Sequence, residues 1–122
     1  MSTIIVLGAG MVGSTMAIDM AKKHSVTLTD FNKKALEKAV SKCNKLIPIP
    51  LDVTNKAALQ KTIKPFDLVI CAVPGFLGFE TLKSIIEAGK NVIDISFFPE
   101  NCFELNELAK QNNITAIVDC GV

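Results

Sequence analysis

The sequence predicts an α/β fold with a doubly wound parallel sheet of six strands, in the order 3-2-1-4-5-6, and helices on both faces in three layers. Short apolar runs alternate with helical patterns along the whole chain. Apolar residues make up 49% of the 122 residues and charged residues 20%, which is a globular composition. A glycine-rich turn follows the first apolar run and opens the first helical pattern. We therefore expect residues 1–122 to form a single domain.

Six short runs are predicted to be strands because they are apolar, rich in β-branched residues and bounded by turn residues. Asp67–Val73 is the most strand-like of them, whereas Pro48 and Pro50 keep the third strand short, since proline cannot donate to a sheet ladder. The predicted strands are Thr3–Leu7, Val26–Thr29, Leu46–Leu51, Asp67–Val73, Val92–Ile95 and Ile114–Val118.

The segments between these runs are predicted to be helices. The first carries Gly13, Ala17 and Ala21 at four-residue spacing, and small residues on one face let a helix approach a sheet closely. Capping and stop residues mark the ends of the others. The predicted helices are Met11–Lys23, one capped by Asn32 that ends near Cys43, one capped by Thr54 or Asn55 that ends at Ile63, Phe79–Ala88 before Gly89, and Pro99–Gln111.

The glycine motif spans residues 8–13 and has the pattern GxGxxG. By itself the pattern is weak evidence, but here it follows a strand and opens a helix, as a dinucleotide site requires. Gly8 permits the tight turn, Gly10 leaves room for a pyrophosphate, and Gly13 lets the helix pack on the strand. The amides near Met11 and Val12 then face the phosphates. This combination predicts a Rossmann-type dinucleotide site.

Asp30 ends the second strand, twenty residues after the middle glycine of the motif. An acid at this place accepts hydrogen bonds from the hydroxyls of the adenine ribose, although a turn or cap role is the plain alternative. A carboxylate repels a 2′-phosphate, and Phe31 rather than arginine follows it, so the cofactor is predicted to be NAD. NADP is the alternative, because Lys34, Lys38 and Lys42 form a basic stripe, although such a stripe is usually a solvated helix face.

Further cofactor contacts are expected at the carboxyl ends of the third and fourth strands, where ligands bind in open α/β sheets. Asp52 and Val53 follow the third strand, and Asp52 either contacts the adenine amine or caps the next helix. Ala72, Val73 and Pro74 follow the fourth strand, where they either border the nicotinamide half or form a plain turn.

Other features exclude several classes of protein. The four cysteines form no CxxC pair and there is one histidine, so we expect no metal site. The net charge of +1 gives no indication of nucleic acid or an anionic membrane as a partner. Apolar surroundings indicate reduced cysteines and a cytoplasmic protein. We recognise neither a signal peptide nor an apolar run that could span a bilayer.

Six blocks of sequence together resemble the NAD(P)-binding domain of the saccharopine dehydrogenase family, which includes lysine 6-dehydrogenase-like enzymes. The resemblance covers the whole chain. The first block is generic to Rossmann proteins, whereas the Asp-Val-Thr after strand three and the last two blocks are more specific in combination. The blocks are VLGAGMVG at 6–13, LTDFN at 28–32, PLDVTN at 50–55, DLVICAVPG at 67–75, NVIDIS at 91–96 and DCGV at 119–122.

The resemblance implies that the chain is the N-terminal part of a longer enzyme of lysine-type amino-acid metabolism. That enzyme would move a hydride between a nicotinamide and a carbon–nitrogen bond, and a second domain would bind the small amino-acid substrate. Phe97 and Phe98 stand where the family often has a tyrosine, so a phenol hydroxyl is absent there. We assign no catalytic residue. We expect the second domain, or a second subunit of a homo-oligomer, to dock on Phe76, Leu77, Phe97 and Phe98.

A second class of protein stays open at this point. Cofactor-sensing regulatory domains of potassium transport proteins share the glycine motif, the acid after strand two and an Asp-x-Thr after strand three. They bind nucleotide without doing chemistry. The segments 73–75 and 119–121 fit the dehydrogenase family better.

Overall fold

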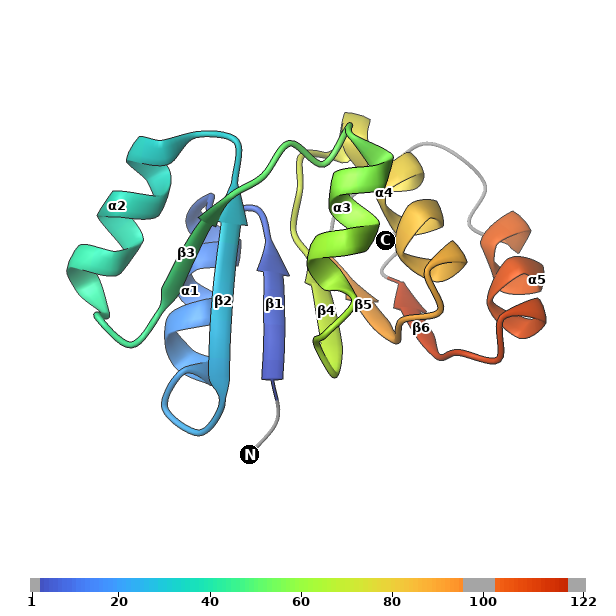
Figure 1. The fold of residues 1–122 in the computed structure, drawn as a ribbon, viewed down its shortest axis with the longest axis horizontal. Helices are drawn as coiled ribbons and strands as arrows, with labels where there is room; N and C mark the ends of the chain where they lie inside the picture. The colour runs from blue at the N-terminus through green and yellow to red at the C-terminus, as the bar shows by residue number, and fades with distance from the viewer. Residues whose placement is uncertain (1–2, 96–102, 119–122) are drawn as a thin grey trace.

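The computed structural model describes residues 3–95 and 103–118 and confirms the predicted fold class. All strand pairs are parallel, and the six-stranded sheet has the order β3-β2-β1-β4-β5-β6 (Figure 1). The point where the strand order reverses lies between β1 and β4, which are hydrogen-bonded neighbours. The strands are β1 (Thr3–Leu7), β2 (Ser25–Asp30), β3 (Ile47–Pro50), β4 (Leu68–Cys71), β5 (Val92–Asp94) and β6 (Ala116–Val118).

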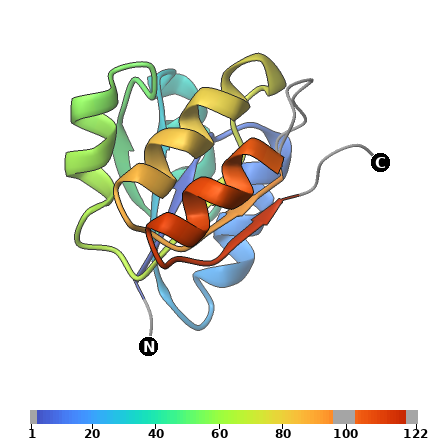
Figure 2. The ribbon, with the colours of Figure 1, turned by 90° about the vertical axis from the view of Figure 1, so that its right-hand side faces the viewer.

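Helices cover both faces of the sheet, which gives the expected three layers. One apolar cluster joins the sheet to α1 and α2, and a second joins the opposite face to α3, α4 and α5. Figure 2 looks from the β6 edge and shows α4 and α5 on one side of the strands and α1 on the other. The helices are α1 (Met11–Met20), α2 (Lys33–Lys42), α3 (Lys56–Ile63), α4 (Gly75–Glu87) and α5 (Phe103–Gln111).

The central strand β1 is buried on both faces because its side chains alternate between the two clusters. Ile5 and Leu7 belong to the α3–α5 cluster, whereas Ile4 and Val6 belong to the α1–α2 cluster. A strand of this kind has a continuous apolar sequence rather than an alternating one. The apolar run that predicted the first strand therefore reflects its central place in the sheet.

Two helix boundaries differ from the prediction. Helix α1 ends at Met20 instead of Lys23, because the chain tightens there: Lys22 N donates to Asp19 O at 3.3 Å and Lys23 N to Met20 O at 3.1 Å, each across three residues instead of four. Helix α4 begins at Gly75 instead of Phe79, with Pro74 as its N-cap residue. In its first turn Phe76 is 83% exposed whereas Leu77 packs partly against the core, so the apolar residues there do not indicate a single buried helix face. The predicted start of the last helix at Pro99 lies outside the described residues.

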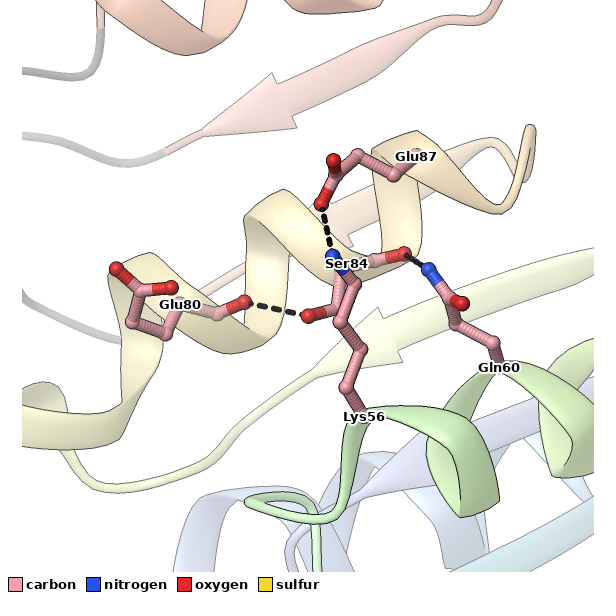
Figure 3. Close-up of polar contacts among 5 residues, drawn as sticks. All are labelled: Lys56, Gln60, Glu80, Ser84 and Glu87. Atoms are coloured by element: carbon pink, nitrogen blue, oxygen red, sulfur yellow. Dashed lines mark hydrogen bonds and ion pairs between the residues drawn. The ribbon is translucent and has the colours of Figure 1, made fainter.

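Polar contacts join α3 to α4 on the outer side of the sheet (Figure 3). Gln60 Nε2 donates to the carbonyl of Ser84 at 2.9 Å, and Lys56 Nζ lies 2.9 Å from Glu87 Oε1. The Lys56 side chain is 55% exposed, so this ion pair adds little stability. The buried residues Leu59 and Ile63 of α3 join α3 to the same apolar cluster as α4.

Asp67 and Thr3 connect the starts of β4 and β1 at the amino edge of the sheet. Thr3 donates to Asp67 Oδ2 from its backbone amide at 3.0 Å and from its hydroxyl at 3.2 Å. The amide bond and then the hydroxyl bond lower the pKa of Asp67 below its ordinary value. The group is therefore a source of pH-dependent stability.

We predict that Asp67→Asn lowers the free energy of unfolding near pH 7 and loses this effect in acid. Because the folded pKa of Asp67 is depressed, its contribution is present above the unfolded pKa and disappears as the pH falls through the folded pKa. Urea unfolding of both proteins at about pH 7 and about pH 3 checks this. Asp19→Asn, which removes only the exposed ion pair to Lys22, is the control. A constant difference between wild type and Asp67→Asn at both pH values would contradict the prediction.

Candidate functional site

The glycine loop lies between β1 and α1, where the strand order reverses. Gly8 has φ +107°, and a Cβ there would overlap the carbonyl of Ala72 after β4. A Cβ on Gly13 would overlap the carbonyl of Gly8. Both glycines are therefore required by the protein itself: Gly8 for its turn and Gly13 for the close approach of α1.

Gly10 is different, because nothing in the protein explains why it is a glycine. Its backbone has φ −69° and ψ −172°, which any residue adopts, and an added Cβ would meet no atom within 4 Å. A side chain would instead occupy the open space over the loop. This space fits a group that approaches the backbone from outside, as the pyrophosphate of a dinucleotide does.

The helices that begin beside this space have uncapped N-termini. Neither N-cap residue, Gly10 of α1 nor Pro74 of α4, gives a side-chain hydrogen bond to the first amides of its helix. By contrast, Asn32 caps α2 and Asn55 caps α3. Met11 and Val12, at the start of α1, are 87% and 59% exposed. The free amides and the positive end of the α1 dipole together favour an anion there.

The carboxylate of Asp30 lies against the glycine loop, as predicted. Its Oδ2 accepts from Ala9 N and its Oδ1 from Asn32 N, each at 2.7 Å. Asp30 thus holds the loop next to the turn between β2 and α2. Each oxygen keeps a lone pair that could accept from a ribose hydroxyl. Sequence reasoning missed the contact from Ala9, because a backbone amide carries no residue-specific pattern.

Asp52 follows β3 and forms a local turn. Thr54 donates to Asp52 Oδ1 from its hydroxyl at 2.6 Å and from its amide at 3.0 Å. These two bonds, the hydroxyl one first, lower the pKa of the carboxyl. Asn55, not Asp52, caps α3 through its side chain. Val53 packs partly against the α3–α5 cluster, so neither residue has a geometry that requires a ligand.

The residues after β4 reach the glycine loop from the other side. Ala72 N donates to Leu7 O at 2.8 Å, and the Ala72 Cβ lies beneath Gly13. Val73 is buried in the α3–α5 cluster, whereas Pro74 is exposed at the start of α4. Ala72 therefore packs against the glycine loop, Pro74 is the N-cap residue of α4, and the side chain of Val73 belongs to the core.

The described part of the chain contains no group of three His, Cys, Asp or Glu residues that could hold a metal ion. Within the same residues, no helix combines the length and apolar character needed to cross a membrane.

Comparison with known proteins gives a family. Residues 4–117 match the model described as saccharopine dehydrogenase NADP binding domain. The chain is 28% identical over 121 residues to saccharopine dehydrogenase [NADP(+), L-glutamate-forming] of Pyricularia oryzae, covering 98% of this chain and 27% of that protein. It is 27% identical over 124 residues to the protein of the same name from Schizosaccharomyces pombe, covering 100% of this chain and 28% of the relative.

A solved structure agrees with these matches. The apo, histidine-tagged saccharopine dehydrogenase (L-Glu forming) of Saccharomyces cerevisiae superposes with a TM-score of 0.83 at 25% identity, covering 97% of this chain and 27% of the other. This chain thus spans just over a quarter of the length of these relatives. The matches confirm the prediction that this domain binds a nicotinamide dinucleotide and give no support to the potassium transport alternative. The chain belongs to the family of saccharopine dehydrogenase NADP binding domains.

Proposed function

We propose that this domain is the cofactor-binding part of a longer oxidoreductase that acts on a carbon–nitrogen bond of an amino acid. The observation that carries the proposal is the open space over Gly10, beside the uncapped start of α1 and the carboxylate of Asp30. A nicotinamide dinucleotide needs these three features together: room for its pyrophosphate, amides for its charge and an acceptor for its ribose. The bound nicotinamide supplies the hydride chemistry.

The roles of the residues follow from their places around the loop. The amides of Met11 and Val12 hold the pyrophosphate, and Asp30 accepts from the adenine ribose. Asp52 and Val53 are at the carboxyl end of β3 on the adenine side, where a contact from Asp52 Oδ2 to the adenine amine is our proposal. Ala72 and Pro74 border the nicotinamide side.

The substrate and its catalytic residues are assigned to a second domain of the parent enzyme. Support comes from the relatives, which are more than three times as long as this chain. Support also comes from exposed apolar residues: Phe76 is 83% exposed at the start of α4, and Ile117 on β6 is 58% exposed. Ile117 pairs with Ile93 on the sheet face that α1 and α2 cover only in part. Such surfaces suit a second domain or a second subunit of a homo-oligomer.

The parent enzyme is proposed to work in the cytoplasm. Cys43 is a free thiol, and Cys71 is buried in the α3–α5 cluster. Reduced cysteines fit a reducing compartment.

The cofactor preference is proposed to be NAD over NADP, although the family description and the fungal relatives name NADP. The carboxylate of Asp30 is the argument, because it lies where a 2′-phosphate would approach the ribose site. The neighbouring Phe31 is 78% exposed and offers no positive charge to a phosphate.

We predict that Gly10→Val weakens binding of NADH by about 100-fold or more while leaving the fold intact. The new side chain fills the space over the loop, yet it meets no protein atom and needs no unusual backbone angle. Isothermal titration calorimetry and urea unfolding give the two quantities. Gly89→Ala is the matched control: Gly89 has φ +75° at the far end of α4, so this change should lower stability and keep affinity. If Gly10→Val bound NADH as tightly as wild type, the assignment of the glycine loop to the pyrophosphate would be wrong.

We predict that Asp30→Asn reduces the ratio of NADH affinity to NADPH affinity by about tenfold. The substitution removes the negative charge but keeps an oxygen that can accept from Ala9 N or Asn32 N. Titration of both cofactors into both proteins measures the ratio. Asp52→Asn, a neutral substitution of the carboxylate after β3, is the control. An unchanged ratio would mean that Asp30 has only a structural role, through the hydrogen bonds that it accepts from Ala9 N and Asn32 N.

A further inference from the structure

One half of the sheet face that carries α1 and α2 receives no helix from the connections between neighbouring strands. The connections through α1 and α2 run toward the β3 edge of the sheet, whereas those through α4 and α5 run toward the β6 edge. Because crossovers between parallel strands are right-handed, the two directions place their helices on opposite faces (Figure 2). Whatever covers the β5–β6 half of the α1–α2 face must therefore come from outside these connections.

The side chains on this half of the face form an apolar row whose exposure increases toward the sheet edge. Ile70 of β4, Ile93 of β5 and Ile117 of β6 are neighbours in register. Ile70 is 1% exposed, Ile93 is partly buried and Ile117 is 58% exposed. Strands of a parallel sheet are ordinarily buried on both faces, so the exposed isoleucine on β6 indicates a missing cover.

The flank of α1 that faces this half of the sheet is apolar as well. Ser14 and Ile18 line cavities against α2, which packs on β2 and β3, so the opposite flank of α1 faces β4. Helical spacing places Val12 and Met16 on that opposite flank. Val12 is 59% exposed, and Met16 packs partly against the α1–α2 cluster, as Ile93 does. We call this surface the uncovered face, and it consists of Val12, Met16, Ile93 and Ile117.

We propose that the uncovered face is the docking site for an amphipathic helix of the parent enzyme that follows residue 122 in its chain. The inference rests on the proposed function, which assigns the substrate to a further domain of the same polypeptide. The lengths of the relatives support this occupant, since this chain spans 27% and 28% of the two fungal proteins. The family match ends at residue 117 on β6, and β6 borders the uncovered face. A chain that continues from β6 therefore starts beside this surface.

A helix is the element that this surface fits. Helices cover both faces of the sheet in α/β proteins, and α1 and α2 already pack side by side on this face. A further helix would lie beside α1, on the flank opposite α2. Its inner side would be an apolar stripe with helical spacing, because no residue of the uncovered face is charged.

This surface is different from the docking residues that the sequence predicts. Phe76 is 83% exposed but lies at the start of α4, and Leu77 packs partly against the α3–α5 cluster. Phe97 and Phe98 lie outside the described residues. Sequence reasoning missed Ile117, because a strand pattern does not tell which face of the sheet lacks a cover.

The test compares Ile117→Lys in the 122-residue chain and in the parent enzyme expressed from its full reading frame. In the 122-residue chain the ammonium group stays in water, so we expect the melting temperature to fall by less than about 2 °C. In the parent enzyme the group would be buried under the docked helix, so we expect a fall of about 4 °C or more. Ile117→Val, which stays apolar, should keep the wild-type melting temperature in both chains.

Ile47→Lys is the matched control, because Ile47 is 49% exposed on β3, the opposite edge strand. It should have the same effect in the 122-residue chain and in the parent enzyme. Equal effects of Ile117→Lys in the two chains would overturn the proposal. Within the parent enzyme, a fall no larger for Ile117→Lys than for Ile47→Lys would also overturn it.

Analytical ultracentrifugation separates the proposed helix from a second copy of this chain. The 122-residue chain should be a monomer. If wild type were a dimer that Ile117→Lys converts to a monomer, the occupant would be a second copy and the proposal would be wrong. Titration of the same chain with NADH tests the proposed function separately, because Ile117 on β6 takes no part in the site around Gly10. Failure to bind NADH would refute the proposed function, and the melting comparison would still decide the docking site.

Discussion

The close approach of α1 to the junction of β1 and β4 is the constraint on which the site depends. Gly8 turns the chain with a positive φ, and Gly13 lets the helix start directly above that turn. Ala72, after β4, closes the same contact from the other strand. Because these atoms touch, the uncapped amides of α1 point into the space at the reversal of strand order. A larger residue at Gly8 or Gly13 would displace the start of the helix and its first amides together.

The fold was predictable because both of its periodicities are strong in this chain. β1 is continuously apolar because it is buried on both faces, and Gly13 and Ala17 are buried on the face of α1 that meets the sheet. The start of α4 was not predictable in this way. Its first turn contains Phe76, which is 83% exposed, so an apolar residue there does not report the buried face. A sequence pattern indicates a helix through the spacing of its buried apolar residues. A helix end that buries few side chains, as at the start of α4, leaves little of this pattern.

The candidate site was predictable where a residue type has a chemical requirement. Glycines and an acid at fixed spacing gave Gly10 and Asp30, and the structure brings Asp30 to the loop through Ala9 N. The same reasoning could not divide the glycines into two groups. Gly8 and Gly13 must be glycines because a side chain there would overlap protein atoms, whereas a side chain at Gly10 would extend into open space. The two reasons for a glycine can be distinguished only from the atoms around it, and these are known only from the tertiary structure.

The lysine stripe of α2 illustrates the same limit for charge. In sequence, Lys34, Lys38 and Lys42 are equivalent members of one stripe. In the fold, Lys38 and Lys42 line a cavity between α1 and α2, next to the glycine loop, whereas Lys34 does not line it. The packing of α1 against α2 therefore determines which lysines lie in the cavity beside the glycine loop. Since Gly13 lets α1 start close to the sheet and Asp30 holds the turn that starts α2, the glycine loop and the end of β2 also position the walls of this cavity.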